Sequence, residues 1–199
     1  MIEIPTDLPA DLVPLSWLVG VWEGTGVIDY EVDGRSYSGE FAHRVSFSHD
    51  GGAFLNYSAD AWLIDAGDRR PLVSEIGYWR LARPAGDADA GPALLPPTAP
   101  AVERTADDVE ALRNADGGFD IEVSLVHADG VLELYVGQVK GPRIDLATDA
   151  VVRASGAKTY TAATRLYGLV DNHLLWAWDI AALGRELGSH ASARLARAE

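Results

Sequence analysis

The sequence predicts an all-β fold, an antiparallel up-and-down barrel of about ten strands preceded by a short N-terminal helix. Three observations favour this fold class. From about residue 20 onward, apolar residues alternate with polar ones more often than they recur at helical spacing. Turn residues interrupt this alternation every eight to twelve positions. No crossover helix separates the predicted strands, so neighbouring strands are expected to pair as sequential hairpins.

Ten segments are expected to form the strands. They span residues 20–30, 39–48, 53–63, 72–81, 119–127, 131–139, 143–153, 158–170, 173–181 and 191–197. Short turns at residues 128–130, 140–142 and 171–172 join several of them as hairpins. A closed sheet of this size has no free edge and encloses a cavity large enough for a small ligand.

Two segments lie outside the strand pattern. Residues 9–19 are expected to form a short helix or turn that plugs one barrel end with its apolar side chains. Residues 83–118 are rich in Ala, Asp, Gly and Pro, which predicts a polar surface excursion. Within it, Thr105 is expected to cap a helix of about two turns that ends at Arg113. The whole chain, residues 1–199, is therefore expected to be one domain.

Composition narrows the function classes. The 199 residues are 48% hydrophobic, enough for one sizeable core. The chain has no cysteine, which excludes disulfides, thiolate nucleophiles, iron–sulfur clusters and cysteine-ligated zinc or haem. A metal would need histidine, carboxylate or other oxygen ligands.

Charge and hydropathy argue against two kinds of partner. The net charge of −14 opposes binding to nucleic acid and to an anionic membrane surface. The sequence has no apolar run approaching the ~20 residues that span a bilayer, and its N-terminus lacks the pattern of a signal peptide. We therefore expect a cytoplasmic protein.

The chain lacks the common enzyme motifs: the P-loop, the dinucleotide-binding glycine motif, the nucleophile elbow and the His-Glu-x-x-His zinc motif. One glycine-rich run does occur on a predicted strand, Gly-x-Trp-x-Gly-x-Gly, formed by Gly20, Trp22, Gly24 and Gly26. Alternate glycines leave bare backbone on one face of a strand. Either Trp22 packs at the barrel base, or the glycines form a wall against which a flat ligand lies.

Five histidines are candidate ligands: His43, His49, His127, His173 and His190. His49 and His173 adjoin turns and are expected to be solvated, whereas His43 and His127 lie on strands whose inward face is undetermined. His190 follows a strongly apolar strand and stands just before the last strand. A neutral imidazole there can offer a nitrogen to haem iron.

Eight blocks of the sequence stand in the order of a known family: residues 15–26, 54–57, 75–80, 129–137, 157–158, 165–170, 174–177 and 190–195. Together these blocks resemble the nitrobindins. This family of haem-binding β-barrels is also described as peroxynitrite isomerases and is related in shape to fatty-acid-binding proteins and lipocalins. The eight blocks cover most of the chain outside the excursion.

The resemblance implies one haem b per chain, with His190 as the proximal iron ligand and catalytic centre. It implies that Lys158 reaches a haem propionate, and that Gly20, Trp22, Gly24 and Gly26 are further cofactor-binding candidates. The implied activity is isomerisation of peroxynitrite to nitrate at ferric haem, in a pocket without a distal acid or base. Nitric oxide is a second candidate ligand, and a homodimer is left open.

The chain departs from the family pattern at two places. Residues 29–34 replace a Tyr-Pro-Thr segment, and residues 127–130 replace a His-Pro-Thr-Gly turn. Two alternative functions are therefore retained. One is a non-haem β-barrel that carries an apolar small molecule. The other is a structural or regulatory protein whose excursion binds a partner.

Overall fold

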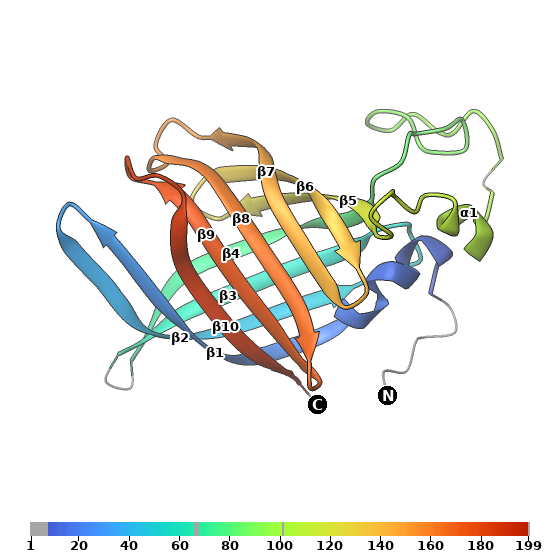
Figure 1. Cartoon of the computed structure of the whole chain (residues 1–199). Helices are drawn as coiled ribbons and strands as arrows, with labels where there is room; N and C mark the ends of the chain where they lie inside the picture. The colour runs from blue at the N-terminus through green and yellow to red at the C-terminus, as the bar shows by residue number, and fades with distance from the viewer. Residues whose placement is uncertain (1–7, 66–67, 101, 199) are drawn as a thin grey trace.

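The computed structural model describes residues 8–65, 68–100 and 102–198. Ten antiparallel strands follow one another around a closed barrel, and the last pairs with the first (Figure 1). The strands are β1 (Gly20–Val32), β2 (Arg35–Ser48), β3 (Leu55–Asp65), β4 (Asp68–Leu81), β5 (Phe119–His127), β6 (Val131–Lys140), β7 (Arg143–Arg153), β8 (Tyr160–Val170), β9 (His173–Ala182) and β10 (Gly188–Arg197). The predicted fold class is confirmed.

Alternating burial explains why these residues form strands. Along β5, every second side chain from Phe119 to His127 is buried, and the intervening ones face outward. Tight turns close the hairpins: Asp171 and Asn172, which join β8 to β9, both have positive φ, as a two-residue hairpin turn requires.

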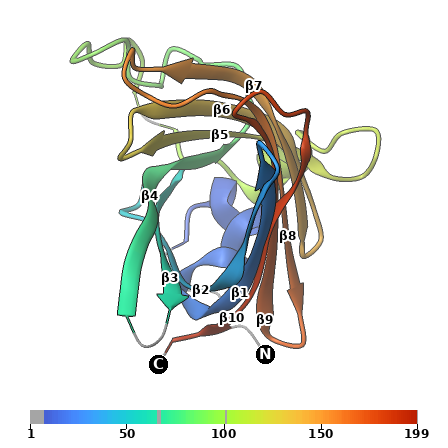
Figure 2. The same cartoon turned by 90° about the vertical axis from the view of Figure 1, so that its left-hand side faces the viewer.

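A 3-10 helix, η1 (Ala10–Leu18), closes one end of the barrel. Its side chains Leu12, Leu15 and Leu18 are fully buried. The indole Nε1 of Trp22 donates a 2.7 Å hydrogen bond to the Leu18 carbonyl, which joins the helix to the first strand. Figure 2 shows η1 inside the outline of the barrel. The expected plug is therefore confirmed.

The excursion lies outside the barrel, beside η1 (Figure 1). Its helix α1 (Ala106–Glu110) begins with the expected cap, because the Thr105 hydroxyl accepts from the Asp108 amide and the Asp108 carboxylate accepts from the Thr105 amide. The helix is shorter than expected and does not reach Arg113, which instead forms an isolated bridge with Phe119. The buried Asp11 of η1 forms an ion pair with Arg104 at 3.2 Å, which ties the excursion to the plug.

The first hairpin extends further than the sequence predicts. The expected first hairpin ended at residue 30 and resumed at residue 39, but β1 and β2 pair as far as Val32 and Arg35. The tip carries mostly exposed side chains, so the apolar alternation fades there while backbone pairing continues. Neither helix in the described part of the chain has the length and hydropathy of a bilayer-spanning segment.

Candidate functional site

A cavity of about 320 Å³ opens at the barrel end opposite η1. Its size lies in the range of small-molecule sites. The walls are largely apolar and aromatic, with Ile28, Phe41, Trp176, Trp178 and Ile180 among the lining residues. The half of the barrel next to η1, in contrast, is filled by buried side chains. The open end is therefore the part of the barrel that can receive a ligand.

His190 lines this cavity from within β10, and not from the turn before the last strand as the sequence suggested. The pairing of β10 with β9 shifts register between Ser189 and Ala191, so His190 is the extra residue of a β-bulge. In a regular strand, His190 would face away from the lumen, since its neighbour Ala191 lines the cavity. The bulge turns the imidazole inward as well.

The imidazole of His190 is held by aromatic edges and not by hydrogen bonds. The ring lies 5.1 Å from the Tyr30 ring and 5.5 Å from the Trp178 ring, centroid to centroid, in edge-to-face geometry. Neither ring nitrogen has a hydrogen-bond partner among the described residues, and Nδ1 is buried. Burial lowers the pKa of His190 to about 4. The ring is thus neutral at neutral pH and has a nitrogen lone pair available for a metal.

Lys158 lies at the cavity rim, in the turn between β7 and β8. Its side chain is exposed. The Lys158 carbonyl accepts a hydrogen bond from Arg153, but its ammonium group contacts no carboxylate of the described chain. It is therefore free to pair with an anionic group on a ligand at the mouth.

The glycine signature lies elsewhere in the barrel. A Cβ atom on Gly24 would lie 2.3 Å from the Arg194 carbonyl oxygen, and one on Gly26 equally close to that of Ser192. These glycines therefore allow β1 to approach β10 closely. Trp22 is 1% exposed and packs against η1, and Gly20 has a φ of 130°.

Among the described residues that line the cavity, none belongs to this signature. This corrects the expectation that Gly20, Trp22, Gly24 and Gly26 join His190 and Lys158 at the ligand. The signature has the packing role, the first of the two roles that the sequence left open.

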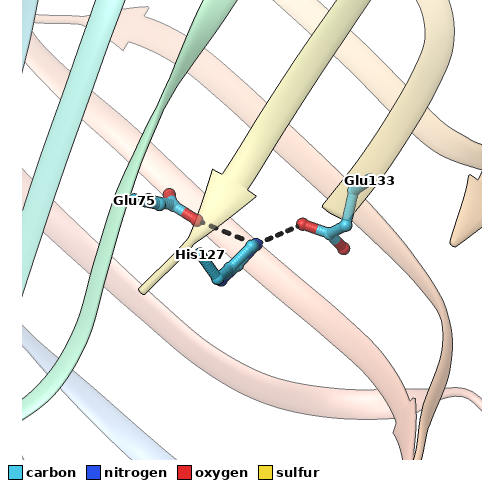
Figure 3. A group of neighbouring side chains, drawn as sticks. All are labelled: Glu75, His127 and Glu133. Atoms are coloured by element: carbon cyan, nitrogen blue, oxygen red, sulfur yellow. Dashed lines mark hydrogen bonds and ion pairs between the residues drawn. The ribbon is translucent and has the colours of Figure 1, made fainter. Parts of the chain in front are cut away.

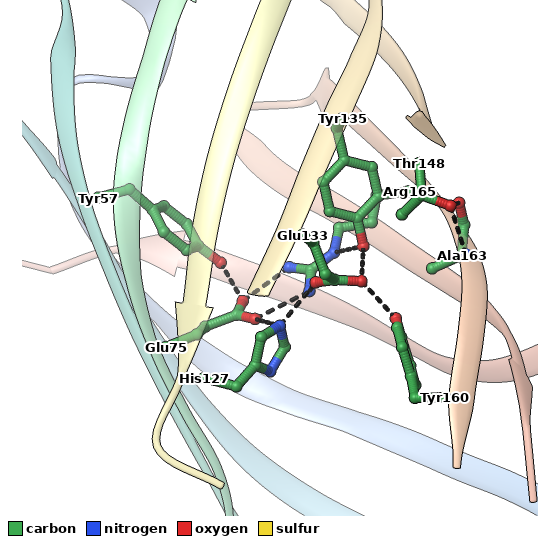
Figure 4. A network of polar contacts seen from close by, with 9 residues as sticks. All are labelled: Tyr57, Glu75, His127, Glu133, Tyr135, Thr148, Tyr160, Ala163 and Arg165. Carbon is green, nitrogen blue, oxygen red and sulfur yellow. Dashed lines mark hydrogen bonds and ion pairs between the residues drawn. The ribbon is translucent and has the colours of Figure 1, made fainter. Parts of the chain in front are cut away.

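A buried charged cluster that was not predicted from the sequence lies next to the cavity (Figure 4). It consists of Glu75, His127, Glu133 and Arg165, from four different strands. Arg165 donates to both oxygens of Glu75, at 2.7 and 2.8 Å, and to Glu133 at 3.2 Å. His127 Nε2 lies 2.6 Å from Glu133 (Figure 3). The signal that could have revealed the cluster is a charged residue at an inward position, such as Glu133 between the buried Val131 and Tyr135.

Three tyrosine hydroxyls complete the hydrogen bonding of the two carboxylates. Tyr57 donates to Glu75 at 2.6 Å, and Tyr135 and Tyr160 donate to Glu133 at 2.7 and 2.6 Å. Burial alone would raise the pKa of Glu75, but the charge and hydrogen bonds of Arg165 outweigh it and lower the pKa to about 2. Burial likewise opposes the ionised form of Glu133, whose pKa is nevertheless lowered by the hydrogen bond from His127 and the charge of Arg165. Both carboxylates are therefore ionised at neutral pH.

The remaining three histidines, one on a strand and two beside turns, lie elsewhere in the barrel. His43 is buried, and its Nδ1 contacts the Asp60 carbonyl at 3.1 Å. His49 and His173, which were expected to be solvated, are partly buried. His173 contacts the Asp171 carbonyl and the Arg194 guanidinium at the outer surface. None of these three histidines is among the described residues that line the cavity.

Comparisons with known proteins agree with this architecture. Residues 11–197 match the model of the THAP4-like, heme-binding beta-barrel domain. Proteins named peroxynitrite isomerase from Leifsonia xyli subsp. xyli and Clavibacter michiganensis subsp. michiganensis are 67% and 64% identical over the full length of both chains. The crystal structure of Rv2717c from M. tuberculosis superposes with a TM-score of 0.68 at 28% identity, covering 96% of this chain and 99% of that one. The chain therefore belongs to the THAP4-like, heme-binding β-barrel family.

Proposed function

We propose that the protein binds one haem b in the cavity, with His190 as the proximal ligand, and that the haem-loaded protein isomerises peroxynitrite to nitrate. One observation carries the proposal: a neutral imidazole without a hydrogen-bond partner faces an apolar cavity. Buried polar atoms are normally hydrogen-bonded. A ring nitrogen without a hydrogen-bond partner can donate its lone pair to a bound metal ion. The names of the relatives supply the reaction.

The other residues of the cavity also fit a haem. Phe41, Trp176 and Trp178 offer flat apolar surface for a porphyrin. Lys158 at the rim can form a charge-assisted contact with a propionate. When bound, the haem supplies an iron centre at which a peroxy ligand can rearrange. His190 would hold the haem, the apolar walls would exclude water, and Lys158 would orient the acidic edge of the haem.

His190 is expected to be a modest electron donor. Metal-bound histidines usually donate their second ring N–H to a carboxylate or carbonyl, which makes the ligating nitrogen more basic. The Nδ1 atom of His190 has no such acceptor among the described residues. We also propose nitric oxide as a second ligand of the same site.

Stopped-flow absorption with product analysis tests the activity. Protein reconstituted with hemin is expected to accelerate peroxynitrite decay and to yield nitrate. With the hemin-free chain or with His190→Ala, peroxynitrite is expected to decay no faster than in buffer. His173→Ala is the matched control, because it removes an imidazole outside the cavity. Equal decay with and without hemin would contradict the proposal. A colourless chain that gains no Soret band but binds an apolar fluorescent probe would favour the carrier alternative.

We further propose a cytoplasmic location. The absence of cysteine supports it, since the fold requires no oxidising compartment to form disulfides. Cell fractionation with an antibody against the protein checks the location.

We also propose that two copies associate through an apolar outer face on β4, β5, β6 and β7. Cross-strand pairing places Ile76, Val126, Leu132 and Val152 side by side in one row across these strands. All four are exposed, Ile76 and Val152 by 60% and 61%. Contiguous apolar side chains on an outer surface are a common feature of protein–protein contacts. A two-fold axis through the row would cover it with the same row of a second copy.

Sedimentation velocity checks the dimer. The native protein is expected to sediment as a dimer, and the double variant Ile76→Glu, Leu132→Glu as a monomer. In a dimer of the variant, the new carboxylates would be buried in the contact beside those of the second copy, without a cation to pair with. Val27→Glu is the control, since Val27 is exposed on β1, away from the row. A native monomer, or a double variant that remains dimeric, would contradict the proposal.

A further inference from the structure

The cavity contains a second imidazole besides that of His190. His127, the last residue of β5, lines the cavity and is 6% exposed. Its Nε2 atom lies 2.6 Å from a Glu133 oxygen and 3.4 Å from a Glu75 oxygen. Its Nδ1 atom has no hydrogen-bond partner in the described part of the chain, and Figure 4 shows it pointing away from both carboxylates. The family resemblance implies a pocket without a distal acid or base, and His127 is a titratable side chain in the wall of this cavity.

The carboxylates determine which nitrogen carries the proton. Because Glu75 and Glu133 are ionised, they can only accept hydrogen bonds. Nε2 must therefore donate, and in the neutral ring Nδ1 is left as a bare acceptor. A carboxylate that fixes an imidazole in one tautomer, with the other nitrogen facing a ligand, is the arrangement of a general base.

The carboxylates of the cluster outnumber its permanent cation. Glu75 and Glu133 contribute two negative charges and Arg165 one positive charge, so the cluster carries a net −1 while His127 is neutral. Tyr160 lies on the cavity side and keeps its proton, because burial raises its pKa. A net charge in a buried site is costly. The imidazolium that forms when His127 takes up a proton would lie between two carboxylates, 2.6 Å from Glu133 and 3.4 Å from Glu75.

Packing holds the His127 ring in place. Trp178 stacks against it with a centroid distance of 6.1 Å and an interplanar angle of 28°. The same indole lies 4.3 Å below the guanidinium carbon of Arg165. The ring is thus confined between the indole and the carboxylates before any ligand enters, as a preorganised base must be.

We propose that His127 is a proton-transfer residue of this cavity, which takes the proton from a protonated oxyacid ligand, here peroxynitrous acid. This inference deepens the proposed function and rests on it. The O–H bond of the acid breaks, its electron pair stays on the oxygen, and the Nδ1 lone pair forms the new N–H bond. The anion remains in the cavity, and the imidazolium returns its proton to water at the open mouth. Glu133 is the positioning residue that keeps Nδ1 free.

The test compares His127→Gln with the native holoprotein in stopped-flow peroxynitrite decay. The glutamine amide can still donate to Glu133 but cannot take up a proton. In acidic buffer, where the ligand is mostly protonated, the variant is expected to be about 100-fold slower, within the usual range for general acid–base catalysis. In alkaline buffer, where the ligand is already an anion, the two rates are expected to converge. His173→Gln, a surface histidine, is the control and is expected to match the native protein in both buffers.

A slowing that is equal in both buffers, or absent from both, would overturn the inference. Failure of the proposed function would look different, because the native holoprotein itself would then be inactive in both buffers. The Soret band on hemin addition is expected to be the same in His127→Gln as in the native protein, which separates proton transfer from haem binding.

A second measurement uses the native chain and does not depend on whether His127→Gln folds. Long-range ¹H–¹⁵N correlation spectra of the full-length native chain report which imidazole nitrogen is protonated. We expect the neutral ring of His127 to carry its proton on Nε2, and Glu133→Gln to weaken this preference. A native spectrum with the proton on Nδ1 would overturn the inference.

Discussion

His190→Ala is expected to weaken hemin binding by about 100-fold or more, because removing even an outer partner of a metal ligand can cost that much. The barrel should remain folded, since the bulge places His190 at the cavity wall and not in the packed half beside η1. A titration with hemin, followed at the Soret band, measures the affinity. Near-native circular dichroism of the variant would confirm that the fold is intact.

Two controls show whether the imidazole itself is responsible. His173→Ala removes a surface imidazole and is expected to bind hemin as the native protein does. Free imidazole added to His190→Ala is expected to restore part of the native spectrum, because the alanine leaves room for it in the cavity. Unchanged hemin affinity in His190→Ala would refute the assignment of the proximal ligand.

Arg165→Met is expected to destabilise the protein by about 3–5 kcal/mol, the usual cost of removing one partner from a buried ion pair. Arg165 is fully buried and forms three hydrogen bonds with Glu75 and Glu133. Methionine of similar length would leave two ionised carboxylates in the barrel with no guanidinium between them. Urea denaturation followed by tryptophan fluorescence measures the free energy of unfolding.

The matched control is Arg80→Met, which breaks an ion pair with Glu122 on the outer surface. The Arg80 side chain is 54% exposed, so the expected loss is only about 0–1 kcal/mol. An Arg165→Met protein as stable as the control would contradict the account of the cluster.

Acid should reduce the difference between the native protein and Arg165→Met. The pKa of Glu75 in the native fold is about 2, below its ordinary value of 4.5. The stability that this lowered pKa contributes is therefore present above pH 4.5 and is lost as the pH falls through about 2. In the variant, protonation relieves the repulsion between the carboxylates, so the two stabilities should converge over this window. A difference that stays constant with pH would show that the ion pairs do not cause it.

Much of the fold follows from local patterns in the sequence. The alternation along β5 and the positive-φ turn of Asp171 and Asn172 depend on neighbouring residues only, so strands and hairpins could be predicted closely. The plug was equally predictable, because the apolar residues of η1 have no partners within their own segment. The length of α1 could not be predicted in this way. Arg113, where the helix was expected to end, instead pairs with Phe119 in an isolated β-bridge.

The functional site depends on contacts that the linear sequence does not show. Simple alternation places His190 outside the barrel, and only the bulge opposite β9 turns it inward. The charged cluster requires β4, β5, β6 and β8 to be aligned in register around a closed sheet. Each of its members is a single polar residue within an apolar alternation, which predicts burial but not the partner.

The most direct test of the central claim is the resonance Raman spectrum of the ferrous haem-loaded protein in the region of the iron–imidazole stretch. We expect this band in the native protein and in His173→Ala, and its loss in His190→Gly. A band that persists in His190→Gly, or is missing from the native protein, would show that the imidazole delivered by the β10 bulge does not bind the iron.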